Sequence, residues 1–144
     1  FPFFSYFFAC LIRETALSYS DFTFDEPSPV PAAYELIENI DIFFKRRWQG
    51  HKIEQRWFSA TIGKFKIEII KIHDWENPPK KIEKITFEIS CENTDVLHIP
   101  AGYVSSIQAM IEFSKLLVMS DYKLDDVSDD YKYSTDYFNE KKKY

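Results

Sequence analysis

Strict alternation of apolar and charged side chains in the middle of this chain restricts it to a fold built from strands. In the segment KFKIEI, residues 64–69, every second side chain is apolar. The segment from Ile82 to Ile89 resumes the pattern through Ile85 and Phe87. A period of two puts the apolar side chains on one face of a sheet, because successive strand residues point to opposite faces. We therefore predict a strand in each segment.

Turn signals and further apolar runs extend this prediction along the chain. The IGK sequence at residues 62–64 predicts a hairpin tip between two antiparallel strands within residues 55–72. Residues 95–110 and 114–122 add at least two more strands, and the IPAGY sequence suits a tight turn between strands. Several short strands without a long amphipathic helix predict an all-β sandwich or barrel.

The chain length of 144 residues suits one domain with a single core, and an aromatic share of 18% favours half-buried strands. Residues 33–44 fit either a short helix or a strand. We expect a strand segment with a proline-rich connector over residues 1–30, the domain over residues 31–138 and a charged tail over residues 139–144. The charged, tyrosine-rich residues 125–144 are expected to cover an end of the barrel and then to fray.

Charge and cysteine content exclude several classes of function. The formal net charge of -5 argues against a nucleic-acid partner, because phosphate binding needs a basic field. The apolar run of residues 1–12 is shorter than the ~20 residues that span a bilayer, so we expect no membrane partner and interpret the run as a buried strand or a segment that packs on a partner. Cys10 and Cys91 have no metal or redox spacing, which indicates a reduced cytoplasmic protein.

The three histidines of the chain differ in their surroundings. His73 lies in the loop sequence KIHDWENPP and is expected at the surface. His98 lies within VLHIP and is expected to serve the sheet rather than the chemistry. Metal binding would need several ligands on one face, so scattered histidines without a His-x-His pair predict no metal site.

His51 has the surroundings best suited to chemistry, in the segment RRWQGHKIEQRW. Gln49 and His51 are two positions apart, so on a strand both side chains point the same way, while Trp48 and Lys52 point the other way. If that face lines the barrel interior, His51 is a base in a partly dry pocket, with a reference pKa of ~6.5 that suits proton transfer near neutrality. The alternative interpretation is a strand histidine with a satisfied hydrogen bond.

Other residues could complete such a pocket. Arg46, Arg47 and Arg56 could supply the positive charge that holds a phosphate or steadies an oxyanion. Tyr122 follows the apolar run KLLVM and could place its phenol at the mouth of the barrel, although tyrosines at strand ends are also common for packing reasons.

Four segments in this order, RRWQGHK, IPAGYVSSIQAM, SKLLVMSDY and DYKYSTDYF, resemble the cupin-type sugar-nucleotide isomerases and epimerases. The resemblance covers roughly residues 13–138 and is strongest to the dTDP-4-keto-6-deoxyhexose 3,4-ketoisomerases. It implies a jelly-roll domain, the double-stranded β-helix, that works as a homodimer without a metal or organic cofactor. It also implies a cytoplasmic role in the route from deoxysugars to surface polysaccharides.

The resemblance assigns roles to individual residues. His51 matches the base that removes the proton beside the 4-keto group of a nucleotide-linked sugar, so that an enediolate forms and a proton returns to a neighbouring carbon or to the opposite face. Tyr122 falls close to a tyrosine that acts as an acid or as a pocket wall. The expected substrate-binding residues are Arg46, Gln49, Lys52, Gln55 and Arg56.

Gln49 leaves a second function open. The ketoisomerases carry a histidine at this position, and an amide can bond a sugar hydroxyl but cannot act as a base. The alternative is therefore a non-catalytic cupin that binds a sugar nucleotide or serves assembly. A purely structural β domain whose apolar N-terminus mediates association is a third reading.

Overall fold

The computed structural model describes residues 10–12, 33–39, 41–123 and 126–138, and these residues form strands and turns without a helix. No described segment could therefore cross a membrane as a helix. The strands in the described residues are β1 (Cys10–Ile12), β2 (Ala33–Asn39), β3 (Trp48–His51), β4 (Arg56–Ile62), β5 (Lys64–Lys71), β6 (Ile85–Ser90), β7 (Val96–Ile99), β8 (Tyr103–Ala109), β9 (Ser114–Ser120) and β10 (Tyr131–Tyr133).

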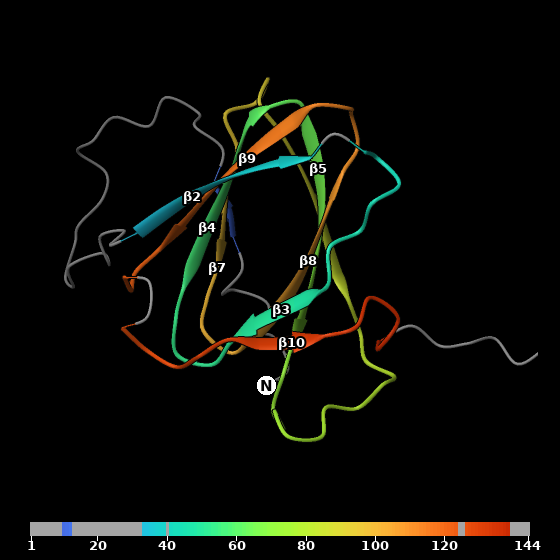
Figure 1. Cartoon of the computed structure of the whole chain (residues 1–144), viewed down its shortest axis with the longest axis vertical. Coiled ribbons are helices and arrows are strands. Elements are labelled where there is room, and N and C mark those ends of the chain that lie inside the picture. The colour runs from blue at the N-terminus through green and yellow to red at the C-terminus, as the bar shows by residue number, and fades with distance from the viewer. Residues whose placement is uncertain (1–9, 13–32, 40, 124–125, 139–144) are drawn as a thin grey trace, which may run out of the picture.

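The strands form two sheets that face each other (Figure 1). The first sheet has the order β1-β7-β4-β9-β2 and the second sheet has the order β10-β3-β8-β5-β6. Every strand pair is antiparallel. The predicted all-β fold is confirmed. Residues 33–39 of the segment that fitted either a helix or a strand form strand β2 along the edge of the first sheet.

The core lies between the two sheets and follows the alternation in the sequence. Phe65, Ile67 and Ile69 of β5 are fully buried, and they share one cluster with Leu97 and Leu116 of the first sheet. Each such side chain removed from water stabilises the fold by about 1.5–3 kcal/mol. The alternation that predicts the strands therefore also places the apolar side chains that hold the two sheets together.

The predicted hairpin at residues 62–64 is wrong, because β4 and β5 do not pair with each other. Strand β4 pairs with β7 and β9, whereas β5 pairs with β6 and β8. The chain crosses from the first sheet to the second at Gly63, whose φ of 75° is the left-handed conformation that glycine tolerates best. A side chain at Gly63 would also collide with the hydroxyl of Ser114.

A second apolar cluster covers the outer face of the second sheet. Trp48, Ile70 and Val104 contribute from the strands, Trp75 from the loop after β5, and Phe138 from the end of the described chain. The segment after residue 125 was expected to cover an end of the barrel. Instead it adds β10 beside β3 and packs on this outer face. The expectations for residues 1–9, 13–32 and 139–144 lie outside the described residues.

Candidate functional site

Strand β3 carries Gln49 and His51 on the face that points between the two sheets. It is held on one side by β8, with Gln49 opposite Ser105 and His51 opposite Tyr103, and on the other side by β10. The predicted alternation is confirmed, because Trp48 is fully buried in the outer cluster.

Gly50 lets this short strand lie against the outer cluster. A Cβ atom there would collide with Val104 and would lie 2.7 Å from the Trp75 ring. Only a residue without a side chain therefore fits between the two inward-facing polar residues.

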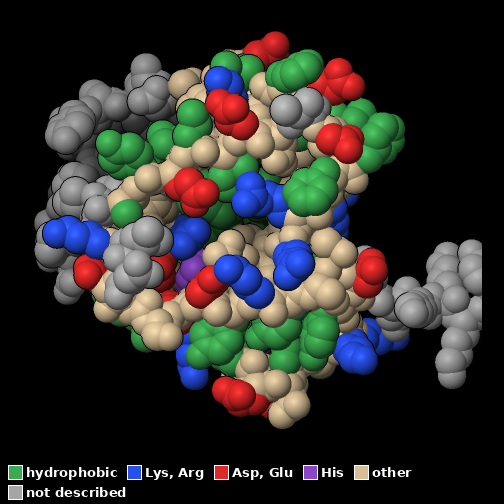
Figure 2. All heavy atoms as spheres, in the orientation of Figure 1, with side chains coloured by type: hydrophobic (Ala, Val, Ile, Leu, Met, Phe, Trp, Pro, Cys, Tyr) green, Lys and Arg blue, Asp and Glu red, His purple; other side chains and the backbone are tan. Residues whose placement is uncertain are grey.

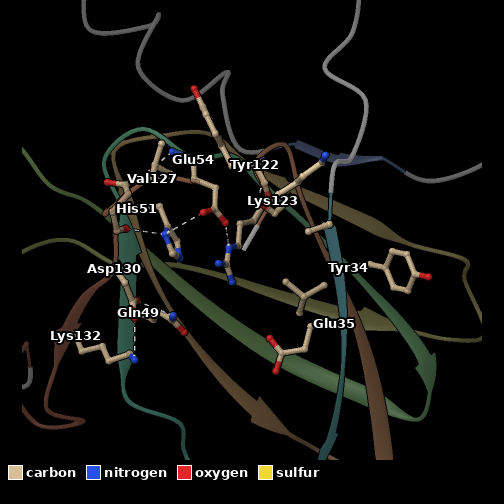
Figure 3. A pocket seen from close by; sticks show the side chains of 15 residues that line it. Tyr34, Glu35, Gln49, His51, Glu54, Tyr122, Lys123, Val127, Asp130 and Lys132 are labelled. Carbon is tan, nitrogen blue, oxygen red and sulfur yellow. Dashed lines mark hydrogen bonds and ion pairs between the residues drawn. The ribbon is translucent and has the colours of Figure 1, made fainter. Parts of the chain in front are cut away.

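A cavity of about 480 Å³ opens between the sheets over His51. Figure 3 shows side chains converging on it from strands of both sheets, and Figure 2 shows basic, acidic and histidine side chains gathered around a hollow on the face that is seen. The residues that line it are Ala33, Tyr34, Glu35, Gln49, His51, Glu54, Arg56, Val118, Ser120, Tyr122, Lys123, Val127, Asp129, Asp130 and Lys132.

The imidazole of His51 is oriented by one hydrogen bond. Its Nδ1 lies 2.8 Å from the backbone carbonyl oxygen of Asp129, and a carbonyl can only accept, so Nδ1 carries the hydrogen. In the neutral ring Nε2 is then the nitrogen that can take a proton. Burial lowers the pKa of His51, and the nearby Arg56 cation lowers it further, while Glu54 opposes the shift. His51 is therefore a neutral base at pH 7.

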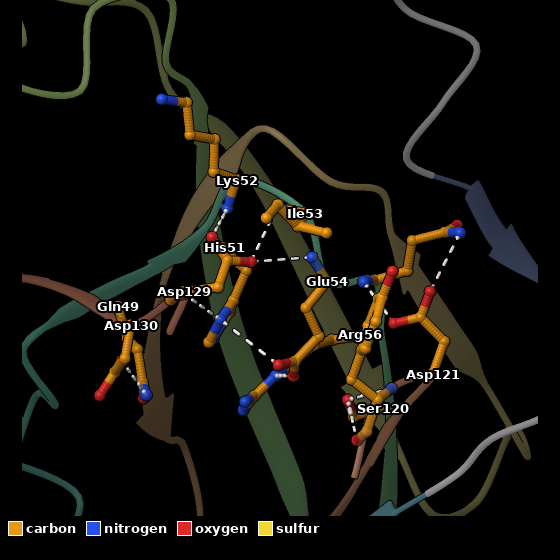
Figure 4. A network of polar contacts seen from close by, with 12 residues as sticks. Gln49, His51, Lys52, Ile53, Glu54, Arg56, Ser120, Asp121, Asp129 and Asp130 are labelled. Carbon is orange, nitrogen blue, oxygen red and sulfur yellow. Dashed lines mark hydrogen bonds and ion pairs between the residues drawn. The ribbon is translucent and has the colours of Figure 1, made fainter. Parts of the chain in front are cut away.

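Asp129 also fixes the loop that follows His51. Its carboxylate is almost completely buried and accepts hydrogen bonds from the backbone N–H groups of Lys52, Ile53 and Glu54 at 2.8, 2.7 and 2.8 Å. Figure 4 shows these three bonds meeting on one carboxylate. One residue thus holds the imidazole through its backbone and the adjacent loop through its side chain.

Glu54 and Arg56 form an ion pair beside the imidazole. The Arg56 Nε lies 2.6 Å from Glu54 Oε1, and Glu54 Oε2 lies 3.8 Å from His51 Nδ1. The pair lines the cavity with both side chains largely buried. It places a guanidinium near the base while largely balancing its charge.

Gln49 is held on the cavity wall by Asp130. The Gln49 Nε2 donates to Asp130 Oδ1 at 2.7 Å, and Lys132 Nζ lies 2.8 Å from the other oxygen of that carboxylate. Partial burial raises the pKa of Asp130, but the hydrogen bonds from Lys132 and Gln49 outweigh it and lower that pKa overall. The amide oxygen of Gln49 keeps its capacity to accept a hydrogen bond.

The predicted site residues fall into three places. Gln49, His51 and Arg56 line the cavity together. Arg46 lies instead in an adjoining groove of about 600 Å³ that also contains Arg47 and shares Gln49 and Lys132 with the cavity.

Lys52 and Gln55 lie outside the cavity. Lys52 is exposed on the far side of the loop. The Gln55 side chain bonds Asp121 at 3.4 Å and His98 at 2.9 Å. Both residues were expected to contact the substrate, but neither lines the cavity.

Tyr122 lies at the rim of the cavity. Its backbone N–H donates to the Ser120 hydroxyl at 3.1 Å, and that hydroxyl donates back to the Tyr122 carbonyl at 3.0 Å. Figure 3 shows its phenol projecting away from the imidazole of His51. The expected position at the mouth of the barrel agrees with this placement.

The other histidines lie outside the cavity, in agreement with expectation. His73 is exposed. His98 stacks on Trp57 with ring centroids 5.1 Å apart and planes at 12°. Among the residues that the structure describes, no group of three or more histidine, cysteine or acidic side chains is arranged to hold a metal ion.

Of the residues that line the cavity, the sequence analysis named only Gln49, His51, Arg56 and Tyr122, so it missed the acidic side chains there. The expected basic pocket is only partly present, because four carboxylates line the cavity beside Arg56, Lys123 and Lys132. Most of the missed charged residues belong to the segment after β9, and its residues from 125 onward were expected only to cover an end of the barrel. The lining residues that the sequence analysis did not name are Ala33, Tyr34, Glu35, Glu54, Val118, Ser120, Lys123, Val127, Asp129, Asp130 and Lys132.

No known protein-family profile and no curated protein sequence matches the chain. Solved structures do match. The sugar 3,4-ketoisomerase QdtA from Thermoanaerobacterium thermosaccharolyticum, solved in complex with TDP, superposes with a TM-score of 0.64 and 18% identity over 92% of this chain and 93% of that protein. The chain has the cupin jelly-roll fold of these enzymes.

Two further solved structures have the same fold. A double mutant of QdtA with TDP matches with a TM-score of 0.56 and 21% identity over 69% of this chain. The dTDP-4-dehydrorhamnose 3,5-epimerase of Bacillus anthracis, solved with TDP and PPi, matches with a TM-score of 0.59 and 12% identity over 74% of this chain. The matched regions span 64% and 60% of those two proteins, which is less than two thirds.

Proposed function

We propose that this cupin is an isomerase or epimerase of a dTDP-linked 4-keto-6-deoxy sugar, similar in activity to the 3,4-ketoisomerases. The observation that carries the proposal is His51, a buried neutral imidazole with its Nδ1 hydrogen bonded and its Nε2 left as the base at the cavity between the sheets. The fold neighbours solved with TDP support a nucleotide-linked substrate.

The proposed reaction needs a base that removes a proton from a sugar carbon. A carbonyl group makes the hydrogen on the adjacent sugar carbon acidic, so a neutral imidazole can remove it. The C–H electron pair then forms a carbon–carbon double bond, and the carbonyl electrons move to oxygen as an enediolate. In isomerisation the imidazolium returns its proton to the former carbonyl carbon, and a hydroxyl proton passes between the two oxygens. In epimerisation a water molecule protonates the opposite face of the same carbon, and the resulting hydroxide takes the proton of the imidazolium. A base whose pKa lies near or below neutrality is suited to both steps.

The adjoining groove provides cations for the diphosphate. Arg46 and Arg47 line it, and neither guanidinium forms an ion pair with another described residue. Lys132 lies where the groove meets the cavity. Guanidinium groups bind phosphate oxygens through paired hydrogen bonds, so the diphosphate is proposed to lie along the groove with the sugar over His51.

The rim and wall are proposed to orient the sugar. Gln49 presents an amide oxygen beside His51 that can accept a hydrogen bond from a sugar hydroxyl. Tyr122 is proposed as a rim contact to the nucleotide or sugar rather than as the acid, because its phenol projects away from the imidazole.

Proton NMR in D2O with dTDP-4-keto-6-deoxyglucose tests the proposal. The wild-type protein should exchange the sugar C3 hydrogen for deuterium, and His51→Asn should not. His98→Asn is the matched control, since it makes the same change at a strand histidine outside the cavity, and it should exchange like the wild type. The product spectrum separates isomerisation from epimerisation.

The alternative function is a cupin that binds a sugar nucleotide without turning it over. Gln49 favours it, because the side chain that shares a face with His51 is an amide that cannot act as a base. Binding of the dTDP-sugar by calorimetry without any C3 exchange in the wild type would establish this alternative. Exchange that persists in His51→Asn would exclude His51 as the base.

The homodimer remains a prediction. Tyr34, Leu36, Phe43 and Phe44 on and after edge strand β2 are more than half exposed. Exposed apolar side chains along a sheet edge favour association. Light scattering during size-exclusion chromatography should give twice the chain mass, and Leu36→Lys should lower it to one chain.

A further inference from the structure

A small recess extends the cavity into the sandwich beneath His51. Its volume of about 10 Å³ corresponds to a single water molecule or one oxygen atom. Four residues line both the cavity and the recess, so the recess adjoins the site; they are Gln49, His51, Glu54 and Arg56. Tyr103 and Ser105 of β8 add two hydroxyl groups to the recess.

Tyr103 is an unexplained polar group at this position. It lies directly opposite His51 in the pairing of β3 with β8, so both side chains share the inner face of the second sheet. It is only 5% exposed, and the described residues provide no hydrogen-bond partner for its hydroxyl. The hydroxyl is therefore available to bond a group that enters the recess.

The chemistry of the lining selects an acceptor oxygen. Burial raises the pKa of Tyr103, so its phenol is protonated at neutral pH and can donate. Arg56 contributes a guanidinium, and Ser105 contributes a hydroxyl. Apolar side chains form the rest of the lining, and the Glu54 carboxylate there is paired with Arg56. A hydrogen-bond donor in such a small, largely apolar space can stabilise a developing oxyanion.

We propose that the recess receives the carbonyl oxygen of the substrate and that the Tyr103 hydroxyl donates a hydrogen bond to it. This inference rests on the proposed function and adds a catalytic residue to it. As His51 removes the hydrogen from the adjacent carbon, the carbonyl electrons move onto the oxygen in the recess, and the bond from Tyr103 strengthens. Tyr103 keeps its proton in this step. The substrate is an α-hydroxy ketone whose carbonyl enters first, because the recess has no room for a larger group.

Isotope-edited infrared spectroscopy tests the hydrogen bond without turnover. The probe is dTDP-4-keto-6-deoxyglucose with ¹³C at the carbonyl, bound to His51→Asn. The carbonyl stretch should be lower in the bound state than in buffer, and adding Tyr103→Phe should return it toward the value in buffer. Tyr131→Phe is the matched control, because Tyr131 packs on the outer cluster, and it should leave the stretch unchanged.

Kinetics in the His51-containing protein give a second readout. Tyr103→Phe should slow C3 exchange by about 10²-fold with KM changed by less than about threefold, as expected for loss of one oxyanion donor. Ser105→Leu should fill the recess and abolish exchange while TDP alone still binds.

The outcomes separate this inference from the proposed function. An unchanged carbonyl stretch and an unchanged exchange rate in Tyr103→Phe would overturn the role of the recess while leaving His51 as the base. Failure of the wild type to exchange and of His51→Asn to bind the ketone would overturn the proposed function, and the recess proposal with it. The circular dichroism spectrum of Tyr103→Phe should match that of the wild type.

Discussion

His51 and His98 show how surroundings separate two histidines of the same fold. Both lie in strands, and burial lowers the pKa of both. His98 directs its Nε2 to the Gln55 amide and stacks on a tryptophan, so its ring is used within the structure. In His51 only Nδ1 is hydrogen bonded, to a backbone carbonyl, and the ring lines a cavity large enough for a sugar. The second nitrogen is what makes His51 a candidate base.

The pKa of His51 should rise when Arg56 is replaced. Arg56 is one of the causes that lower this pKa, and its loss also leaves the Glu54 carboxylate free to stabilise the imidazolium. Arg56→Gln should therefore move the midpoint of the imidazole C–H signals of His51 to higher pH in an NMR titration. The acidic limb of kcat/KM should move in the same direction, since the protonated ring cannot act as a base.

Lys123→Gln is the control for this titration. Lys123 also lines the cavity, but it is not among the charges that shift His51. Equal midpoints for wild type and Arg56→Gln would contradict the proposed electrostatic role of Arg56.

At the scale of elements, a strand of four residues positions the proposed base. Strand β3 is short, yet it is held by β8 and β10 on its two sides and by the outer cluster below. The loop that follows it is fixed by the Asp129 carboxylate. Precise placement of His51 therefore depends on contacts from three distant parts of the chain.

Gly50→Ala should test how tightly β3 is packed. The added methyl group would collide with Val104 and Trp75, and overpacking of this kind costs about 1–3 kcal/mol of unfolding free energy. Urea denaturation should show this loss. The loss measured for the double variant with Val104→Ala should be smaller than the sum of the losses of the two single variants, because Val104→Ala makes room for the methyl group. Strict additivity would mean that the strand is free to shift.

Asp129→Ala should loosen the loop after β3. Three N–H groups lose one charged acceptor, and hydrogen bonds to charged groups contribute about 1.5–3 kcal/mol each to stability. Because the loop can move and bond water once the carboxylate is gone, we expect a total loss of about 3 kcal/mol. Asp130→Ala is the neighbouring control, since its side chain is nearly half exposed, and it should cost less than about 1 kcal/mol. Slow backbone amide exchange at residues 52–54 should be lost in Asp129→Ala alone.

At the scale of the whole molecule, stability should fall as the solution is acidified below pH 7. The folded-state pKa values of His51 and His98 lie below the ordinary value of 6.5. The unfolded chain therefore binds more protons than the folded chain in this range, and the unfolding free energy rises with pH. The lowered pKa of Asp130 adds a further loss at more acidic pH, below its ordinary value of 3.8.

Urea midpoints measured between pH 5.5 and 7.5 should reveal the histidine contribution. The midpoint should be lower at pH 5.5 than at pH 7.5 in the wild type. Replacing both His51 and His98 by glutamine should flatten the slope, whereas replacing the exposed His73 should preserve it. A slope that survives the double replacement would assign the pH dependence to other groups.

Local patterns predicted the strands and the faces of their side chains. The alternation in β5 placed Phe65 and Ile67 in the core, and the two-residue spacing placed Gln49 and His51 on one inner face. These predictions succeed because the direction of a strand side chain depends only on its neighbours along the chain.

The partners of those strands and the enclosure of the cavity depended on tertiary structure. Gly63 resembles a hairpin tip in the sequence, but the chain crosses there to the other sheet, since burying both apolar faces requires two sheets rather than one hairpin. Asp129 contacts His51 across 78 positions of sequence, and no local pattern signals such a contact. The sequence therefore determined the residue type of the proposed base and the sheet face on which it lies. Its tautomer, its lowered pKa and the recess next to it arose only when distant segments packed together.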